Sequence, residues 1–275
     1  MRPLSARNPR VAQLNRLVLR REVRAEERAF VVEGPTLLAA ALDADRMPTD
    51  LFVDEDALDR PGIAQVLQRV AMSGPDAPEP WILPAGTIDR VGDATTSQGV
   101  VAVVPTVESQ WPEPAGTDLV MVLADVADPG NAGTLLRTAT AAGAGAVAAT
   151  GVDLTSPKVV RSSAGSVFSV DLLAPEDIVQ AVRRLADAGY LTVGTTVEGG
   201  LPYDEGDYTG PTAIVVGNEA HGLAPEVIDV LDLVVTIPMS GPTESLNVAM
   251  AGTVVAFEVL RQRRHTTADT GRSRG

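Results

Sequence analysis

The chain has 275 residues, of which 45% are hydrophobic and 3% aromatic, so a sizeable core is possible and must consist mainly of Val, Ala and Leu. The net charge of −14 argues against a protein that binds nucleic acid over its whole surface. The absence of cysteine and the presence of only two histidines exclude disulfides, a thiol nucleophile and cysteine-ligated zinc, so no metal is expected.

The chain begins with a segment that predicts a basic helix over 10–28. Residues 1–28 hold eight of the 22 Lys and Arg against three Glu, a net charge of +5, whereas the remainder carries −19. Such asymmetry is typical of a basic arm that contacts RNA phosphates. The alternative is a solvated amphipathic helix, because Val11, Leu14 and Leu17 share one face. No apolar signal-peptide core follows Met1, so we expect a cytoplasmic protein.

A small αβ unit is predicted next, over 29–104. The expected strands are 29–32, 51–53, 81–83 and 99–104, and the expected helices are 34–42 and 63–72. Residues 105–117 then contain three Pro and one Gly among mostly polar neighbours, which is typical of an interdomain linker.

The second half of the chain alternates regularly between strands and helices. The expected strands are 119–124, 146–150, 167–172, 191–195, 213–216 and 233–237, and the expected helices are 131–142, 157–164, 175–188 and 245–264. This alternation predicts a parallel sheet with helices on both faces, in which ligands bind at the carboxyl ends of the strands. We therefore expect the chemistry in the loops after Ala124, Thr195, Val216 and Ile237.

The last predicted helix, 245–264, is apolar around nearly its whole circumference, so one sheet face cannot cover it. We expect a second copy of the chain to bury residues such as Val255 and Leu260. The apolar stretch from Leu246 to Leu260 contains Asn247 and Glu258 and is too short to predict a membrane span. The polar tail after it, 265–275, is expected to be disordered.

Polar residues gather in three segments that follow strands of the second half. They are Asn131 and Arg137 in 128–139, Glu219 in 216–223, and Ser245 and Asn247 in 237–249. Each has a local interpretation: Asn131 and Ser245 can cap helices, Arg137 can be solvated, and Glu219 can be a turn residue. Asn247 is a poor helix former and is harder to explain this way. Together the five residues favour a site at one edge of the sheet.

In order and spacing these segments resemble the TrmH/SpoU family of SPOUT methyltransferases. The resemblance is carried by Asp128–Ala139, Val216–Leu223 and Ile237–Ala249, and it extends to Lys158–Gly165, Thr96–Val100 and Phe30–Gly34. It covers residues 10 to 264, and the third segment is long and specific.

The resemblance implies an α/β fold: a trefoil-knotted parallel-sheet methyltransferase domain preceded by a small αβ domain of the L30e type that binds RNA. The expected parts are a basic arm at 1–28, an L30e-like domain at 29–104, a linker at 105–117, a SPOUT catalytic domain at 118–264 and the tail at 265–275. The implied cofactor is S-adenosylmethionine, and the implied partners are RNA and a second copy bound through the C-terminal domain. The positions that match cofactor contacts are Thr195, Gly217, Gly222, Ile237, Met239 and Leu246.

The implied reaction is attack of a ribose 2′-oxygen on the sulfonium methyl group. Arg137 matches the family's catalytic arginine, but a guanidinium does not normally lose its proton, so it can instead grip the substrate phosphate and stabilise the developing alkoxide. Asn131, Ser245 and Asn247 are expected to position ribose and cofactor, and Glu219 to accept hydrogen bonds from substrate or to orient Arg137. The candidate RNA contacts are Arg10, Arg20, Arg24 and Arg161.

Four functions compete at this point. The two-domain layout favours a ribosomal RNA 2′-O-methyltransferase over a transfer-RNA 2′-O-methyltransferase of the same family. A non-catalytic RNA-binding relative is disfavoured because the polar residues of all three segments are present. A dehydrogenase is weakest: the glycine-rich run at 143–148 follows a helix and enters a strand, the reverse of the dinucleotide-binding arrangement.

Overall fold

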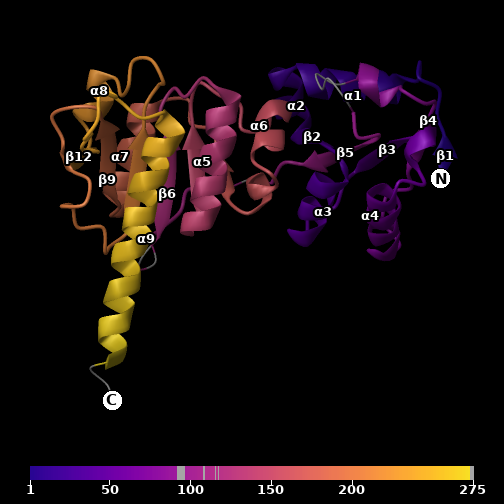
Figure 1. Cartoon of the computed structure of the whole chain (residues 1–275). Coiled ribbons are helices and arrows are strands. Elements are labelled where there is room, and N and C mark those ends of the chain that lie inside the picture. Colours follow the sequence, from indigo (N-terminus) through magenta and orange to yellow (C-terminus); the bar gives the residue numbers. More distant parts are fainter. Residues whose placement is uncertain (92–96, 108, 115, 117, 273–275) are drawn as a thin grey trace. The chain divides into compact units, whose positions relative to one another are not determined.

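The computed structural model describes residues 1–91, 97–107, 109–114, 116 and 118–272, with backbone only for 266–272 (Figure 1). The chain divides into two compact units. The N-terminal unit comprises Met1–Glu108 and Thr155–Phe168, and the C-terminal unit comprises Ser109–Leu154 and Ser169–Gly275. Of the residues that the resemblance rests on, Thr96 lies outside the described part of the chain.

The N-terminal unit is built on a mixed five-stranded sheet in the order β1-β4-β3-β5-β2. Its strands are β1 (Arg2–Pro3), β2 (Ala29–Glu33), β3 (Asp50–Asp54), β4 (Trp81–Leu83) and β5 (Val100–Pro105), with helices α3 (Pro35–Asp43) and α4 (Pro61–Met72). β2 and β3 both pair antiparallel with β5, and β4 pairs parallel with β3 and with β1. Leu38, Leu51 and Ile63 lie in the core where α3 and α4 meet the sheet.

The prediction of one helix over 10–28 is wrong. Two helices form, α1 (Pro9–Leu19) and α2 (Arg21–Glu27), because Arg20 between them has extended backbone angles. Arg24 of α2 is only 6% exposed, and its guanidinium donates hydrogen bonds to the carbonyl oxygens of Leu17 (2.7 Å) and Val18 (3.0 Å). Those carbonyls end α1 without helical partners. Arg24 therefore caps a helix and is not available to RNA.

A segment from the second half of the sequence belongs to the N-terminal unit. It contains α6 (Pro157–Ser162), which contacts β2, and a 3-10 turn at Ser166–Phe168. The Phe168 ring stacks on Phe30 with ring centroids 5.9 Å apart. The predicted strand over 167–172 is accordingly shorter and later, and the predicted catalytic domain 118–264 is interrupted by these residues. The sequence indicates that an apolar side chain such as Phe168 is buried. It does not indicate which of the two units buries it.

The C-terminal unit is built on a seven-stranded sheet in the order β10-β12-β9-β11-β6-β7-β8, and every neighbouring pair is parallel. Its strands are β6 (Leu119–Leu123), β7 (Ala146–Ala149), β8 (Asp171–Leu173), β9 (Leu191–Thr196), β10 (Leu201–Pro202), β11 (Thr212–Val216) and β12 (Leu233–Thr236). Its helices are α5 (Pro129–Ala142), α7 (Ile178–Ala188), α8 (Pro225–Ile228) and α9 (Val248–Arg272). The predicted parallel α/β sheet is confirmed.

Helices cover both faces of this sheet. α5 and α9 lie side by side on one face, against β6 and β11, while α7 and α8 pack together on the other (Figure 1). The end of the predicted linker also joins this unit, because Trp111 packs on the α7 side beneath the Arg184 guanidinium, 5.2 Å from the ring centroid. β6, β9, β11 and β12 are adjacent, so their carboxyl ends share one edge.

α9 differs from its prediction at both ends. It begins after Asn247, whose side-chain oxygen accepts a hydrogen bond from the backbone N–H of Ala249 (2.9 Å), so Asn247 caps the helix and is not inside it. It continues to Arg272 through most of the tail predicted to be disordered, and Figure 1 shows its last turns extending beyond the sheet. Val255, expected to need a partner subunit, is fully buried within the chain. No described helix is long and apolar enough to cross a membrane.

Candidate functional site

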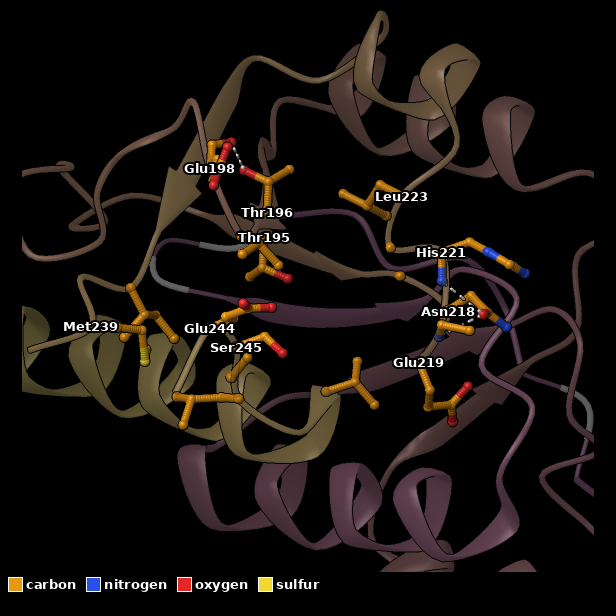
Figure 2. Close-up of a pocket in the computed structure, with 18 residues that line it drawn as sticks. Thr195, Thr196, Glu198, Asn218, Glu219, His221, Leu223, Met239, Glu244 and Ser245 are labelled. Atoms are coloured by element: carbon orange, nitrogen blue, oxygen red, sulfur yellow. Dashed lines mark hydrogen bonds between the residues drawn. The ribbon is translucent and has the colours of Figure 1, made fainter. Parts of the chain in front are cut away.

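A cavity of about 450 Å³ opens at the carboxyl edge of the seven-stranded sheet (Figure 2). Its walls come from the loops that follow β9, β11 and β12. All six residues predicted from the family's cofactor contacts line it: Thr195, Gly217, Gly222, Ile237, Met239 and Leu246. Residues from three segments, separated by about 20 positions each in sequence, meet here because their strands are parallel and adjacent.

The loop after β11 is closed by its own hydrogen bonds. Asn218 and Gly222 exchange backbone hydrogen bonds of 2.9 Å in both directions. A Cβ on Gly217 would lie 2.3 Å from the carbonyl carbon of Gly222, so only glycine fits there. The side-chain oxygen of Asn218 accepts from the N–H of Ala220 (2.9 Å), and its amide donates to the Asp125 carbonyl (2.9 Å). Asn218 thus joins this loop to the loop after β6, a role that the sequence analysis missed.

Glu219 lines the cavity and is the centre of a hydrogen-bond network that reaches the loop before α5. One carboxylate oxygen accepts from the N–H of Ala127 (3.1 Å), and the other accepts from the N–H of Asp128 (3.0 Å) and from the Asn131 side-chain amide (3.0 Å). Burial alone would raise the pKa of Glu219, but these hydrogen bonds outweigh it and hold the pKa below its ordinary value. Glu219 therefore acts as an ionised acceptor that holds the start of α5.

Asn131 continues this network toward α9. Its side-chain oxygen accepts a hydrogen bond of 2.9 Å from the Asn247 side-chain amide. The suggestion that Asn131 merely caps α5 is wrong, because the cap is Asp128, whose carboxylate accepts from the Asn131 N–H (2.8 Å). Three residues of the predicted site, Glu219, Asn131 and Asn247, are thus linked in one chain of hydrogen bonds.

Two other predicted catalytic residues are placed differently. Ser245 is exposed and lines the cavity. Arg137 is exposed on α5, about 9 Å along the helix axis from Asn131, and is not among the cavity-lining residues. Within the described residues its guanidinium makes no hydrogen bond or ion pair, and the Glu219 carboxylate is engaged by Ala127, Asp128 and Asn131 instead.

The candidate RNA contacts in the N-terminal unit are partly engaged within it. Arg10 pairs with Asp50 (2.9 Å) and lies over the Trp81 ring, 4.9 Å from its centroid. Arg161 pairs with Glu33 (3.2 Å), and only Arg20 is exposed without such a partner among the described residues. For metal binding, the described part of the chain holds no group of three or more His, Cys, Asp or Glu that could form a centre.

Comparison with known proteins points to one family. A profile of the SpoU rRNA Methylase family matches residues 118–257, which contain every strand that borders the cavity. An uncharacterized tRNA/rRNA methyltransferase of Mycolicibacterium smegmatis is 40% identical over 148 residues, which is 53% of this chain and 47% of that protein. The 23S rRNA (uridine(2479)-2′-O)-methyltransferase of Streptomyces viridochromogenes is 38% identical over 154 residues, 53% of this chain and 54% of that protein. The chain spans about half the length of the curated relatives it matches.

Solved structures match over nearly the whole chain. The SpoU methyltransferase AviRb from Streptomyces viridochromogenes, in complex with the cofactor AdoMet, has a TM-score of 0.83 and 28% identity, covering 94% of this chain and 98% of that one. An AdoMet-bound rRNA methyltransferase from Sinorhizobium meliloti has a TM-score of 0.81 and 28% identity, covering 94% and 97%. With a profile match over half the chain and a fold shared from end to end, this chain belongs to the SpoU rRNA Methylase family.

Proposed function

We propose that this chain transfers the methyl group of S-adenosylmethionine to a ribose 2′-hydroxyl of ribosomal RNA. The observation that carries the proposal is the cavity at the carboxyl edge, which lies entirely within the unit that matches the family and shares its fold with AdoMet-bound relatives. Ribosomal RNA is favoured over transfer RNA because named rRNA methyltransferases match 94% of the chain, whereas the TrmH/SpoU tRNA modifying enzyme of A. aeolicus matches 56% with a TM-score of 0.52. Such a substrate implies work in the cytoplasm.

The cavity has the composition that an adenosine ligand needs. Leu223, Ile237 and Leu246 supply apolar walls, and the backbone of the Gly217–Gly222 loop supplies hydrogen-bonding groups beside them. Apolar walls with a few fixed polar groups are the usual setting for a nucleoside. In this proposal the Glu219–Asn131–Asn247 network holds the rim of the site, and Ser245 faces the ligand.

Arg137 remains the candidate that binds the substrate phosphate and stabilises the developing alkoxide. Since Arg137 lies outside the cavity of its own chain, we further propose a homodimer in which the exposed face of α9 is covered by a second copy. Met250 and Phe257, about two turns apart on α9, are 61% and 45% exposed. Burying apolar side chains of this size stabilises by about 1.5–3 kcal/mol each.

The direct test is binding of S-adenosylmethionine to the full chain by calorimetry, followed by transfer of labelled methyl groups to ribosomal RNA and mapping of the 2′-O-methyl site. We expect Gly217→Ala to abolish binding, because its Cβ would meet Gly222. Gly210→Ala is the matched control, since a Cβ there meets no atom within 4 Å. Lack of binding by the unaltered chain, or equal binding by both variants, would contradict the proposal.

A further inference from the structure

The walls of the cavity carry only acidic charge apart from one histidine. Among the 18 described residues that line it, the ionisable ones are Glu198, Glu219, Glu244 and His221, with no Lys or Arg. The three carboxylates come from three different loops, after β9, after β11 and before α9. Figure 2 shows the His221 ring pointing away from Thr195 and Glu244, so it does not balance the charge between those loops.

Two of these carboxylates have no structural use in the chain. Glu219 accepts three hydrogen bonds from the start of α5 and its charge serves that network. Glu198 and Glu244 are exposed, and within the described residues no hydrogen bond or ion pair reaches their carboxylate oxygens. Two acidic side chains with no internal partner, placed on the wall of one cavity, act on whatever occupies it.

We propose that Glu198 and Glu244 select the positively charged cofactor over its neutral product. This inference rests on the proposed function. In the reaction the 2′-oxygen forms a bond to the methyl carbon, the carbon–sulfur bond breaks with its electron pair going to sulfur, and the hydroxyl proton passes to solvent. The cofactor therefore changes from a sulfonium of net charge +1 to a thioether of net charge zero. The two ligands otherwise differ by one methyl group, so charge is the largest difference available for discrimination.

The size of the effect follows from Coulomb's law. A carboxylate about 6–8 Å from a unit positive charge changes a dissociation constant by about two- to tenfold, depending on how far water screens the pair. Because both side chains are exposed, the effect weakens as salt is added. S-adenosylmethionine gains this attraction and S-adenosylhomocysteine does not. The product thus leaves the site more readily than the cofactor, which limits inhibition by product.

The test measures three ligands by calorimetry on the full chain: S-adenosylmethionine, S-adenosylhomocysteine, and sinefungin, which carries an ammonium group in place of the sulfonium methyl. We expect Glu198→Gln and Glu244→Gln each to weaken the first and third about two- to tenfold and to leave S-adenosylhomocysteine unchanged. Glu226→Gln is the matched control, because Glu226 is an exposed acidic residue of α8 in the same unit that does not line the cavity.

Binding of the product, S-adenosylhomocysteine, separates a loss of charge selection from a loss of folding. Unchanged binding of S-adenosylhomocysteine shows that a variant still folds its cavity. Equal weakening of all three ligands, or no change in any, would overturn charge selection while leaving the proposed function intact. Failure of the unaltered chain to bind any of the three would overturn the proposed function, and this inference with it.

Discussion

Replacing Glu219 by Gln tests whether Glu219 contributes to methyl transfer through its hydrogen-bond network and not by direct contact with substrate. The variant keeps the shape but replaces one of the two carboxylate oxygens, which accept separately from the backbone N–H groups of Ala127 and Asp128, by an N–H₂ group that cannot accept. Hydrogen bonds to a charged acceptor contribute about 1.5–3 kcal/mol each. Water replaces part of this at an exposed side chain, so we expect a total loss of about 2 kcal/mol and a melting temperature lower by about 4–8 °C.

The effect on methyl transfer should exceed the effect on stability. Freed from Glu219, the Asn131 amide can rotate and release Asn247, which shifts groups at the start of both α5 and α9. Misplacement of this kind costs about 100-fold in rate. We expect the dissociation constant of S-adenosylmethionine to change less than threefold, because the Glu219 carboxylate is engaged by Ala127, Asp128 and Asn131 and the other residues that line the cavity are unchanged. A fall in affinity as large as the fall in rate would show that Glu219 serves the cavity directly.

The pH dependence and a second variant complete the test. The pKa of Glu219 is lowered on folding, so its stabilisation is present at neutral pH and is lost as pH falls through the folded-state pKa. The difference in melting temperature between the wild type and Glu219→Gln should therefore shrink in acid. Adding Asn131→Asp to Glu219→Gln restores one donor–acceptor pair with the roles exchanged and should recover part of the activity, whereas Asn131→Asp alone sets two carboxylates together. Wild-type stability and turnover in Glu219→Gln would refute the reasoning.

Three further predictions follow from the same structure. Arg137→Ala should abolish methyl transfer and leave cofactor affinity nearly intact, and turnover by the folded variant would remove it from the mechanism. Phe257→Glu should lower the dimer content in sedimentation at micromolar concentration while the monomer stays folded, whereas Val255→Glu should unfold the C-terminal unit because Val255 is fully buried; an active wild-type monomer would contradict the proposed dimer. Arg24→Met should reduce stability by about 2 kcal/mol without changing the salt dependence of RNA binding, and Arg20→Gln should reduce that slope by about 0.7–0.9 if Arg20 contacts one phosphate.

The edge of the sheet that holds the site could be predicted from sequence, because periodic patterns indicate the strands and helices and their alternation indicates a parallel sheet. Strands at 119–124, 213–216 and 233–237 were expected, and β6, β11 and β12 begin at or next to those positions. In a parallel sheet the loops after the strands share one edge, and the positions that the family resemblance matched to cofactor contacts line one cavity there because β9, β11 and β12 are neighbours. The trefoil knot and the L30e-like character of the N-terminal unit stay predictions.

The roles of individual polar residues could not be predicted in this way. The bond between Asn131 and Glu219 joins positions 88 residues apart, and that between Asn131 and Asn247 joins positions 116 apart. The sequence around Asn131 does not distinguish an asparagine that caps α5 from one that links two loops, because an asparagine in either role lies at the start of a helix. The same limit applies to Arg24, where a basic residue in a basic arm turns inward to the carbonyls that end α1.

The sequence of α9 indicates how much of this helix is buried, but it does not indicate which of its sides the rest of the chain covers. Sequence alone indicates that α9 is apolar on too many sides for one sheet face. In the structure most of the apolar surface of α9 is buried within the chain, because α5 lies beside α9 on the same face of the sheet. Gly252 allows this close packing, since a Cβ at this position would lie 2.7 Å from the Leu135 side chain. Val255, Ala256 and Val259 are covered in this way, while Met250 and Phe257 are not. The argument for a second copy therefore rests on this narrower stripe, and it is there, not at Val255, that a charged substitution can separate subunits without unfolding them.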